Sequence, residues 1–211
     1  MTKGMEDLLR TVERRLGEKG LFGKAGDSVS LRIPGSTRFM ICEASDGALR
    51  TLELDARSEE AGSIHGFVYR VRPDAGAIVL GSTPWTGAVA AMGARVPTLF
   101  DEQARHIGKT HAPVPESDQE ALSIALRDGG NAAILGARRL GIGSTPNRVV
   151  LNADLFEKCS KAFVIASASG QAIRSLPTWV TEIWNRRLIS DQSRAGKAYR
   201  SGRIPEGMDA Y

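Results

Sequence analysis

Hydrophobic and polar residues alternate along the chain with two different periods, which predicts both helices and strands. Residues 5–16 repeat hydrophobic side chains every three or four positions, as an amphipathic helix does. Residues 29–33 alternate as a half-buried strand should, residues 38–42 form a second apolar run, and an Asp-Gly turn precedes residues 49–54. We therefore expect an opening helix followed by a group of antiparallel strands.

The stretch 62–93 passes from helix to strand to helix with almost no intervening residues. Its first part carries hydrophobic residues at helical spacing and should end before Pro73, which cannot continue a helix. Residues 75–80 then form a short buried strand. After a turn at 81–84, residues 86–92 are rich in small side chains, which suit a helix close to a neighbour. The turn that follows the strand is the natural place for a functional site.

The second half of the chain is mostly helical. Ser117 and Glu120 have the spacing of a capping box, which predicts a helix that ends near Arg127. Residues 131–135 form the next strand, and hydrophobic residues at helical spacing continue to Ile189. The strand-rich first third and the helix-rich last third together predict an α/β fold, an α/β/α layered single domain around a mostly antiparallel central sheet.

Residues 141–145, with the sequence Gly-Ile-Gly-Ser-Thr, allow two interpretations. A glycine-rich loop at a helix N-terminus can hold a phosphate. The segment lacks a lysine, however, and Thr145 as the N-cap of a helix that begins with Pro146 explains the same residues more simply. We favour the cap.

Composition fits a globular domain, because 42% of the 211 residues are hydrophobic and 25% are charged. The net charge of +4 arises near the C-terminus, where few aromatic residues are available to stack on bases, so we expect no nucleic-acid partner. We divide the chain into a domain over residues 1–190 and a basic, solvated tail over 191–211. The basic residues near the C-terminus are Arg186, Arg187, Arg194, Lys197, Arg200 and Arg203.

The sequence also bears on compartment and redox state. No apolar run reaches the length of a membrane span, and the N-terminal segment is charged throughout, so we expect a cytoplasmic protein with no membrane partner. Cys42 and Cys159 are far apart and inside predicted elements, which favours two reduced, buried thiols over a disulfide.

Several motifs in the central stretch resemble those of a known family. His65-x-x-x-Tyr69 is followed by Arg72-Pro73-Asp74-Ala75 and by an apolar strand that leads into Pro84-Trp85. This order is similar to that of the class II aldolase/adducin family, which includes fuculose phosphate aldolases, ribulose phosphate epimerases and adducin heads. The resemblance runs without gaps through this stretch, and weaker matches extend it from Gly26 to Ala168. It implies the family's layered fold.

The residues that carry the family's chemistry differ here. The family continues this strand into two metal-binding histidines and takes a third histidine from a later strand end, and the equivalent positions hold Leu80, Ser82 and Arg138. Its catalytic glutamate maps onto Ala61. Glu60 lies beside that position and reaches the pocket only if the helix is shifted by one residue. A guanidinium has no lone pair to offer a metal, so we expect no bound metal and no cofactor.

The phosphate contact of the family is also altered. The asparagine that helps to hold a substrate phosphate is replaced in the Asp27-Ser28 segment, and an aspartate carboxylate repels a phosphate. A phosphorylated substrate is therefore disfavoured. The resemblance further implies a four-fold ring of subunits, in which Trp179 and Trp184 could pack on a neighbouring chain and C-terminal residues could complete its site.

Two hypotheses from different classes follow. In the first, the protein is a metal-independent lyase or hydratase, in which Arg138 replaces the metal, holds the carboxylate or carbonyl of a small molecule and stabilises enolate charge. In the second, it is a non-catalytic relative, like adducin heads, that serves binding or assembly. The hydroxyl groups of the site are also compatible with purely structural roles. The candidate catalytic residues are Arg138, Ser82, Tyr69 and Glu60, and the candidate substrate-binding residues are Arg139, Thr83, Trp85, Ser28 and His65.

Overall fold

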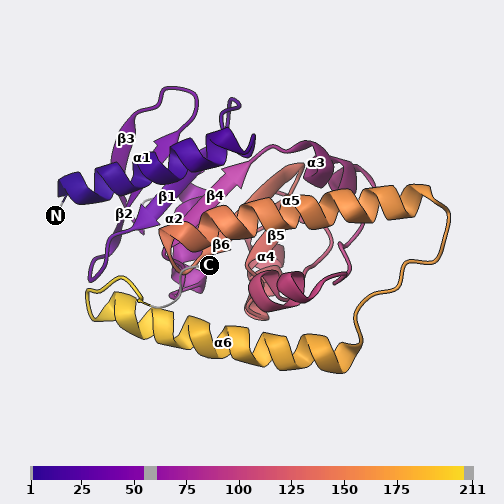
Figure 1. The fold of residues 1–211 in the computed structure, drawn as a ribbon. Helices are drawn as coiled ribbons and strands as arrows, with labels where there is room; N and C mark the ends of the chain where they lie inside the picture. Colours follow the sequence, from indigo (N-terminus) through magenta and orange to yellow (C-terminus); the bar gives the residue numbers. More distant parts are fainter. Residues whose placement is uncertain (1, 55–60, 207–211) are drawn as a thin grey trace.

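Helices pack on both faces of one six-stranded sheet in the computed structural model, which describes residues 2–54 and 61–206 (Figure 1). This arrangement confirms the predicted fold class. The strands are β1 (Ser28–Arg32), β2 (Arg38–Glu43), β3 (Leu49–Glu53), β4 (Ala77–Gly81), β5 (Ala132–Leu135) and β6 (Arg138–Gly143). The helices are α1 (Thr2–Glu18), α2 (Ala61–Val71), α3 (Pro84–Ala91), α4 (Gln119–Arg127), α5 (Pro146–Ala168) and α6 (Thr178–Arg200), with a π-helical turn η1 at Gln103–Ile107.

The strand order is β3-β2-β1-β4-β6-β5, and neighbouring strands are antiparallel throughout the sheet. In the central pairs, Ser28 of β1 lies opposite Leu80 of β4, and Gly81 of β4 lies opposite Arg139 of β6. The start of β1, the end of β4 and the start of β6 therefore meet at one end of the sheet. Most of the residues that the sequence singled out lie at this end.

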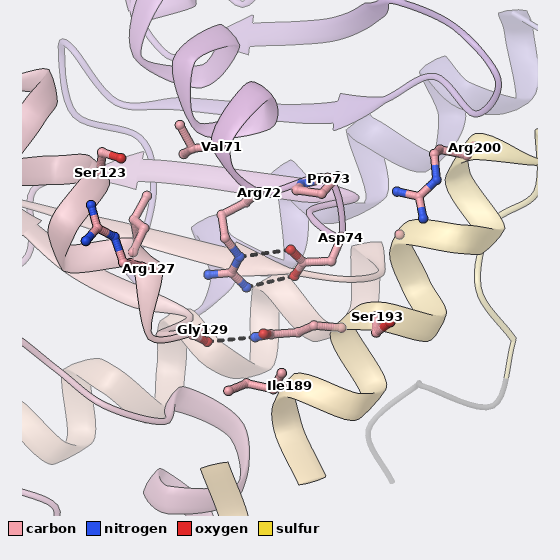
Figure 2. Close-up of a pocket in the computed structure, with 13 residues that line it drawn as sticks. Val71, Arg72, Pro73, Asp74, Ser123, Arg127, Gly129, Ile189, Ser193 and Arg200 are labelled. Carbon is pink, nitrogen blue, oxygen red and sulfur yellow. Dashed lines mark hydrogen bonds and ion pairs between the residues drawn. The ribbon is translucent and has the colours of Figure 1, made fainter. Parts of the chain in front are cut away.

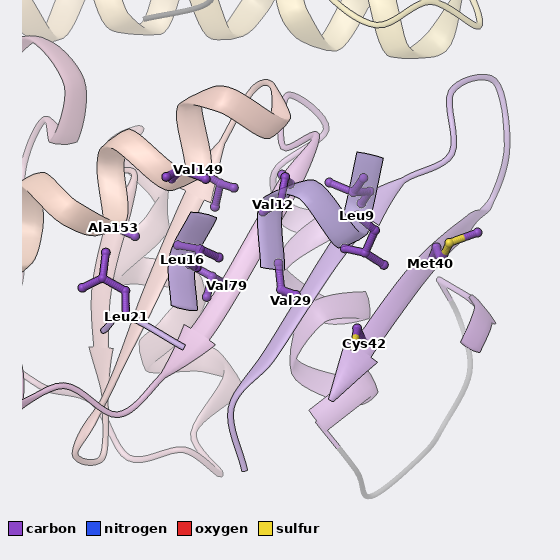
Figure 3. Close-up of a cluster of buried hydrophobic side chains, with 13 residues drawn as sticks. Leu9, Val12, Leu16, Leu21, Val29, Met40, Cys42, Val79, Val149 and Ala153 are labelled. Atoms are coloured by element: carbon purple, nitrogen blue, oxygen red, sulfur yellow. The ribbon is translucent and has the colours of Figure 1, made fainter. Parts of the chain in front are cut away.

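Helices α1 and α5 cover one face of the sheet, and α2 and α4 cover the other (Figure 1). Beneath α1, the side chains of Leu9, Val12 and Leu16 point toward Val29 and Val79 of the sheet (Figure 3). Burial of each such side chain contributes roughly 1.5–3 kcal/mol, so this cluster holds α1 firmly on the strands. The hydrophobic period that predicted the opening helix is the one that faces the sheet.

Three local features refine or correct the sequence analysis. The N-cap of α4 is Asp118 and not Ser117, because the Asp118 carboxylate accepts a hydrogen bond of 2.8 Å from the N–H of Ala121. The predicted N-cap of α5 is confirmed, since the Thr145 side chain accepts from the N–H of Arg148. Both buried cysteines are free thiols, and burial raises the pKa of Cys42 to about 11 and of Cys159 to about 12.

Strand β6 was missed by the sequence analysis because glycines interrupt its hydrophobic pattern. Gly143 is required by α5, which crosses closely over the strand, and Gly141 is required by a side chain of the neighbouring strand β4. A Cβ atom at Gly143 would lie 2.2 Å from the backbone nitrogen of Val149, and one at Gly141 would lie 3.0 Å from a methyl group of Val79. Residues that resemble turn residues in the sequence therefore permit the close approach of a helix to a strand.

Helix α6 runs along the outside of the molecule, past α4 and η1 (Figure 1). Residues 191–200, which the sequence analysis assigned to the tail, continue this helix and bury Gln192, Ala195 and Tyr199. The hydroxyl of Tyr199 donates to the carbonyl of Ser144 at 2.9 Å. The C-terminal end of α6 is thus tied to the sheet. None of the described helices has the length and hydrophobicity needed to cross a membrane.

Candidate functional site

Arg138 and Arg139 open β6 and point to opposite faces of the sheet, because successive side chains of a strand alternate. Arg139 lies opposite Gly81 on the face that α5 covers, and Arg138 lies on the face of α2 and α4. The sheet end therefore carries two separate polar clusters, one on each face.

Arg138 is a fixed cation at the rim of the first cluster. Its Nε donates to Oε1 of Glu116 at 2.8 Å, its Nη2 contacts Oε2 of the same carboxylate, and its Nη1 donates to the carbonyl of Gly26 at 2.9 Å. The side chains of Arg138 and Glu116 are 20% and 39% exposed. The guanidinium therefore already holds a carboxylate in the two-point geometry that suits it, and solvent reaches that carboxylate.

His65 lies behind Arg138 and is fully buried. Its Nε2 lies 2.8 Å from the Ser28 hydroxyl, and its Nδ1 lies 2.6 Å from the Ser30 hydroxyl. Burial, together with the positive charge of Arg138, lowers the pKa of His65 to about 3. The imidazole is therefore neutral at physiological pH, with both ring nitrogens occupied by serine hydroxyls. It therefore has no free nitrogen with which to exchange a proton with a ligand.

Tyr69, one turn further along α2, belongs to the same buried chain of hydroxyl groups. Its hydroxyl lies 2.9 Å from the Ser30 hydroxyl, and the guanidinium of Arg32 lies 4.7 Å from the centre of its ring. Burial raises the pKa of Tyr69 well above its usual value. The phenol is therefore a hydrogen-bonded core group whose proton is not available near neutral pH.

The second cluster surrounds Arg139, whose side chain has no exposed surface. Its Nη2 donates to the carbonyl of Leu21 at 2.9 Å, while Nε and Nη1 have no hydrogen-bond partner among the described residues. Burial lowers the pKa of Arg139 to about 10, and the carboxylates of Glu157 and Asp27 oppose that shift. Arg139 is thus a buried cation stabilised by carboxylates of its own chain.

The Glu157 carboxylate organises the start of α3. It accepts hydrogen bonds from the Thr83 hydroxyl at 2.7 Å, from the N–H of Trp85 at 2.8 Å, and from the hydroxyl and N–H of Thr86 at 2.7 and 3.1 Å. A carboxylate at this position also matches the positive end of the helix dipole. The Thr83 hydroxyl and the backbone N–H of Trp85 therefore stabilise this turn through their hydrogen bonds to Glu157.

The Asp27 carboxylate plays a similar role on the loop before β1. Its Oδ1 accepts from the N–H of Ser82 at 2.9 Å, and its Oδ2 accepts from the N–H groups of Gly23 and Lys24 at 3.1 and 2.9 Å. Asp27 thus ties the end of β4 to the N-terminal loop. The Ser82 side chain remains half-buried next to the Arg138 end of β6.

The three positions that correspond to the family's metal ligands do not fit a divalent ion. Leu80 is fully buried in the core, Ser82 offers one neutral hydroxyl, and Arg138 brings a permanent positive charge. Across residues 2–54 and 61–206, no three His, Cys, Asp or Glu side chains are placed to hold a metal together.

The structure brings some of the predicted site residues together and separates others. Arg138, Ser28 and His65 share one face of the sheet end with Tyr69 at greater depth, and Ser82 lies at the edge beside them. Glu60 lies outside the described residues. The remaining predicted residues belong to the turn at α3 or to the opposite face of the sheet, and they are Thr83, Trp85 and Arg139.

Two carboxylates of the site were not predicted from the sequence. Glu116 reaches Arg138 because the loop before α4 folds back toward β6, and no local sequence pattern predicts that contact. Glu157 could have been predicted as a site residue from its position in the sequence. It follows Phe156 and lies four residues after Ala153 on the buried side of α5, where a charged residue needs a partner.

The protein is a layered α/β protein, in which an antiparallel sheet lies between helical layers. Polar residues gather at the end of the sheet where β1, β4 and β6 meet. The sequence profile of the Class II Aldolase and Adducin N-terminal domain matches residues 8–163. The chain belongs to this family.

Known structures share the fold at low sequence identity. An L-fuculose 1-phosphate aldolase superimposes with a TM-score of 0.74 at 15% identity, covering 90% of this chain and 97% of its own. The L-fuculose 1-phosphate aldolase from Glaciozyma antarctica PI12 gives 0.69 at 17% identity, with 93% and 88% covered. The enzyme of that name from Thermus thermophilus gives 0.64 at 20% identity, with 82% and 100% covered. No curated protein matches the sequence.

Proposed function

We propose that this protein binds a small carboxylate- or carbonyl-bearing molecule at Arg138 without a metal ion and stabilises an enolate formed from it. The reaction class is that of a lyase or a hydratase, in which a carbon–carbon or carbon–oxygen bond beside the enolate is broken or formed. Arg138 supplies the positive charge that stabilises the enolate oxygen.

The observation that supports this proposal is the ion pair between Arg138 and Glu116. Two N–H groups of the guanidinium already hold a carboxylate, and the carbonyl of Gly26 fixes the third contact. A carboxylate of a small molecule has the same shape and charge as that of Glu116. It can therefore replace Glu116 on Arg138, because the Glu116 side chain is 39% exposed and free to turn toward solvent.

The displaced Glu116 is also the proton-transfer group that this proposal requires. His65 and Tyr69 are buried, and their pKa values are shifted away from neutrality. Glu116 starts beside the ligand, because its carboxylate occupies the contact on Arg138 that the ligand takes over. We assign to Glu116 the removal of the proton next to the ligand carbonyl.

The proposal is tested with pyruvate, whose methyl protons exchange with deuterium when an enolate forms. The protein is treated with EDTA and incubated with pyruvate in D2O, and exchange is followed by NMR while binding is measured by calorimetry. We expect exchange above the buffer rate that survives the chelator. Arg138→Ala should abolish both exchange and binding. Glu116→Gln should abolish exchange but strengthen binding, because the competing carboxylate is gone.

Arg14→Ala is the matched control, because Arg14 is an exposed arginine of α1 that pairs with Glu18 and does not belong to the sheet-end clusters. It should leave both measurements unchanged. Equal pyruvate binding by the wild type and Arg138→Ala would contradict the proposed site, and exchange that EDTA removes would contradict the metal-free chemistry.

A second function, non-catalytic binding, is favoured by one observation. The imidazole of His65 and the phenol of Tyr69 are joined through the Ser30 hydroxyl into a buried network that rigidifies the sheet end. Such a network supports a binding surface without taking part in chemistry. Pyruvate binding that depends on Arg138 but brings no deuterium exchange would identify the protein as a binding member of the family.

A further inference from the structure

A polar cavity lies at the opposite end of the sheet from Arg138, between α2, α4 and α6. Its volume is about 440 Å³, which is large enough for a small metabolite. Residues 71–74, which join α2 to β4, form one wall, and the last turns of α4 form another. Helix α6 closes the third side with Ile189, Gln192, Ser193, Gly196 and Arg200.

The floor of this cavity is a buried ion pair (Figure 2). Nε and Nη2 of Arg72 donate to the two carboxylate oxygens of Asp74 at 2.9 and 2.7 Å, and the same Nη2 donates to Oδ1 of Asn131 at 2.8 Å. Beside the pair, Nε2 of Gln192 donates to the carbonyl of Gly129 at 2.7 Å. The floor is therefore rigid and close to neutral in charge, so the net charge of the cavity is set by its rim.

The rim carries two arginines, Arg127 at the end of α4 and Arg200 at the end of α6. In the part of the chain that the structure describes, neither guanidinium makes an ion pair or a hydrogen bond with another residue. Figure 2 shows the two side chains on opposite sides of the Arg72–Asp74 pair. The cavity thus has an unneutralised cation at each end.

The remaining lining provides neutral contacts between these cations. The hydroxyls of Ser123 and Ser193 make no hydrogen bond to other described residues, and Leu126 and Ile189 present apolar surface. A ligand that fills this space needs an anionic group near each end and a short carbon skeleton between them. Arginine binds carboxylate and phosphate groups by the same two-point geometry.

We propose that this cavity is a binding site for a small organic dianion with its two anionic groups at opposite ends, such as a dicarboxylate or a phosphorylated carboxylate. Arg127 holds one end and Arg200 the other, with Ser123 and Ser193 contacting the skeleton. Because Arg200 and Arg127 come from different helices, the bound ligand clamps α6 against α4. The site is separate from Arg138 and does not depend on the function proposed there.

The test is calorimetric titration of the full-length protein with succinate, glutarate and 3-phosphoglycerate, with butyrate as a singly charged probe of similar size. We expect the dianions to bind and butyrate to bind roughly tenfold more weakly or worse, since butyrate can make only one of the two charge-assisted contacts. The comparison of glutarate with 3-phosphoglycerate distinguishes a dicarboxylate from a phosphorylated ligand. Arg127→Ala and Arg200→Ala should each weaken binding by a similar factor.

Two variants separate this site from others. Arg194→Ala is the matched control, because Arg194 is an exposed arginine of α6 that pairs with Asp191 and does not line the cavity. It should bind the dianions as the wild type does. In Arg138→Ala, which lacks the carboxylate site proposed at Arg138, the dianion binding that depends on Arg127 and Arg200 should persist. Loss of dianion binding in Arg138→Ala with retention in the Arg127→Ala/Arg200→Ala double variant would overturn the proposal, as would equal binding of glutarate and butyrate.

Discussion

The Arg138 guanidinium and the Glu116 carboxylate meet in a two-point contact at the edge of the sheet, with Nε 2.8 Å from Oε1. Both side chains are partly exposed, and exposed ion pairs contribute at most about 1 kcal/mol to folding. We therefore predict that Arg138→Ala and Glu116→Gln both fold, each with a free energy of unfolding within about 1 kcal/mol of the wild type. Urea titrations followed by circular dichroism check this, and a loss of several kcal/mol would assign the pair a structural role.

Acid should destabilise the protein through its buried histidines. The pKa of His65 is lowered to about 3, and that of His106 to about 4, by burial and nearby arginines, whereas in the unfolded chain both have the ordinary value of 6.5. Below pH 6.5 the unfolded chain binds protons that the folded protein does not, so stability falls as the pH decreases. Each histidine contributes at most about 1.4 kcal/mol per pH unit.

This prediction is checked by urea unfolding at pH 7.5, 6 and 5. The wild type should lose stability steadily over this range, and His65→Asn should lose less between pH 6 and 5, although it is less stable at pH 7.5. An identical slope in the two proteins would show that His65 takes up its proton as readily when folded as when unfolded.

Glu157→Ala should be among the most destabilising single changes in the chain. It removes the acceptor of four hydrogen bonds at the start of α3 and leaves the buried charge of Arg139 with less compensation. Each buried donor that is left without an acceptor typically costs about 1–3 kcal/mol. Glu157→Gln should cost less, since its amide oxygen still accepts. Exposed Glu120→Gln is the control, and chemical denaturation is the measurement.

Gly76→Ala should detach the end of α6 from the sheet. An added Cβ would lie 1.8 Å from the Tyr199 hydroxyl oxygen and 2.4 Å from the carbonyl oxygen of Ser144, so Tyr199 must leave its place. We expect a loss of more than about 2 kcal/mol, together with faster hydrogen exchange in the last turns of α6. Gly87→Ala, where nothing lies within 4 Å of the added atom, should be neutral or stabilising.

The predicted tetramer can be tested at an exposed surface of α6. Trp179 is 68% exposed and Ile183 is 46% exposed in the single chain, so both are available to a neighbouring subunit. We expect light scattering to give about four times the chain mass of 22.6 kDa, and Trp179→Ser/Ile183→Ser to lower it. A wild-type mass near that of one chain would contradict this prediction.

The sequence predicts those helices and strands whose own residues show a hydrophobic repeat or a capping motif. The hydrophobic stripe of α1 and the capped start of α5 are local patterns, and both were identified. Strand β6 was not predicted, because its glycines are explained only by tertiary contacts: Gly143 by the helix that crosses it and Gly141 by Val79 of β4. The same holds for the site: Arg138 was singled out by comparison with a family pattern, whereas its partner Glu116 depends on a loop geometry that no local pattern encodes.

The two successive arginines of β6 also determine how that strand pairs. A glycine-rich strand has few side chains to fix its register, and a slip of one residue would exchange the two faces of the sheet. Such a slip would turn Arg139 away from Glu157 and carry Arg138 from the solvent-reached rim toward the α5 core. The two guanidinium groups therefore favour the correct register, in which Arg138 pairs with Glu116 and Arg139 lies near enough to Glu157 and Asp27 to be stabilised by their charge.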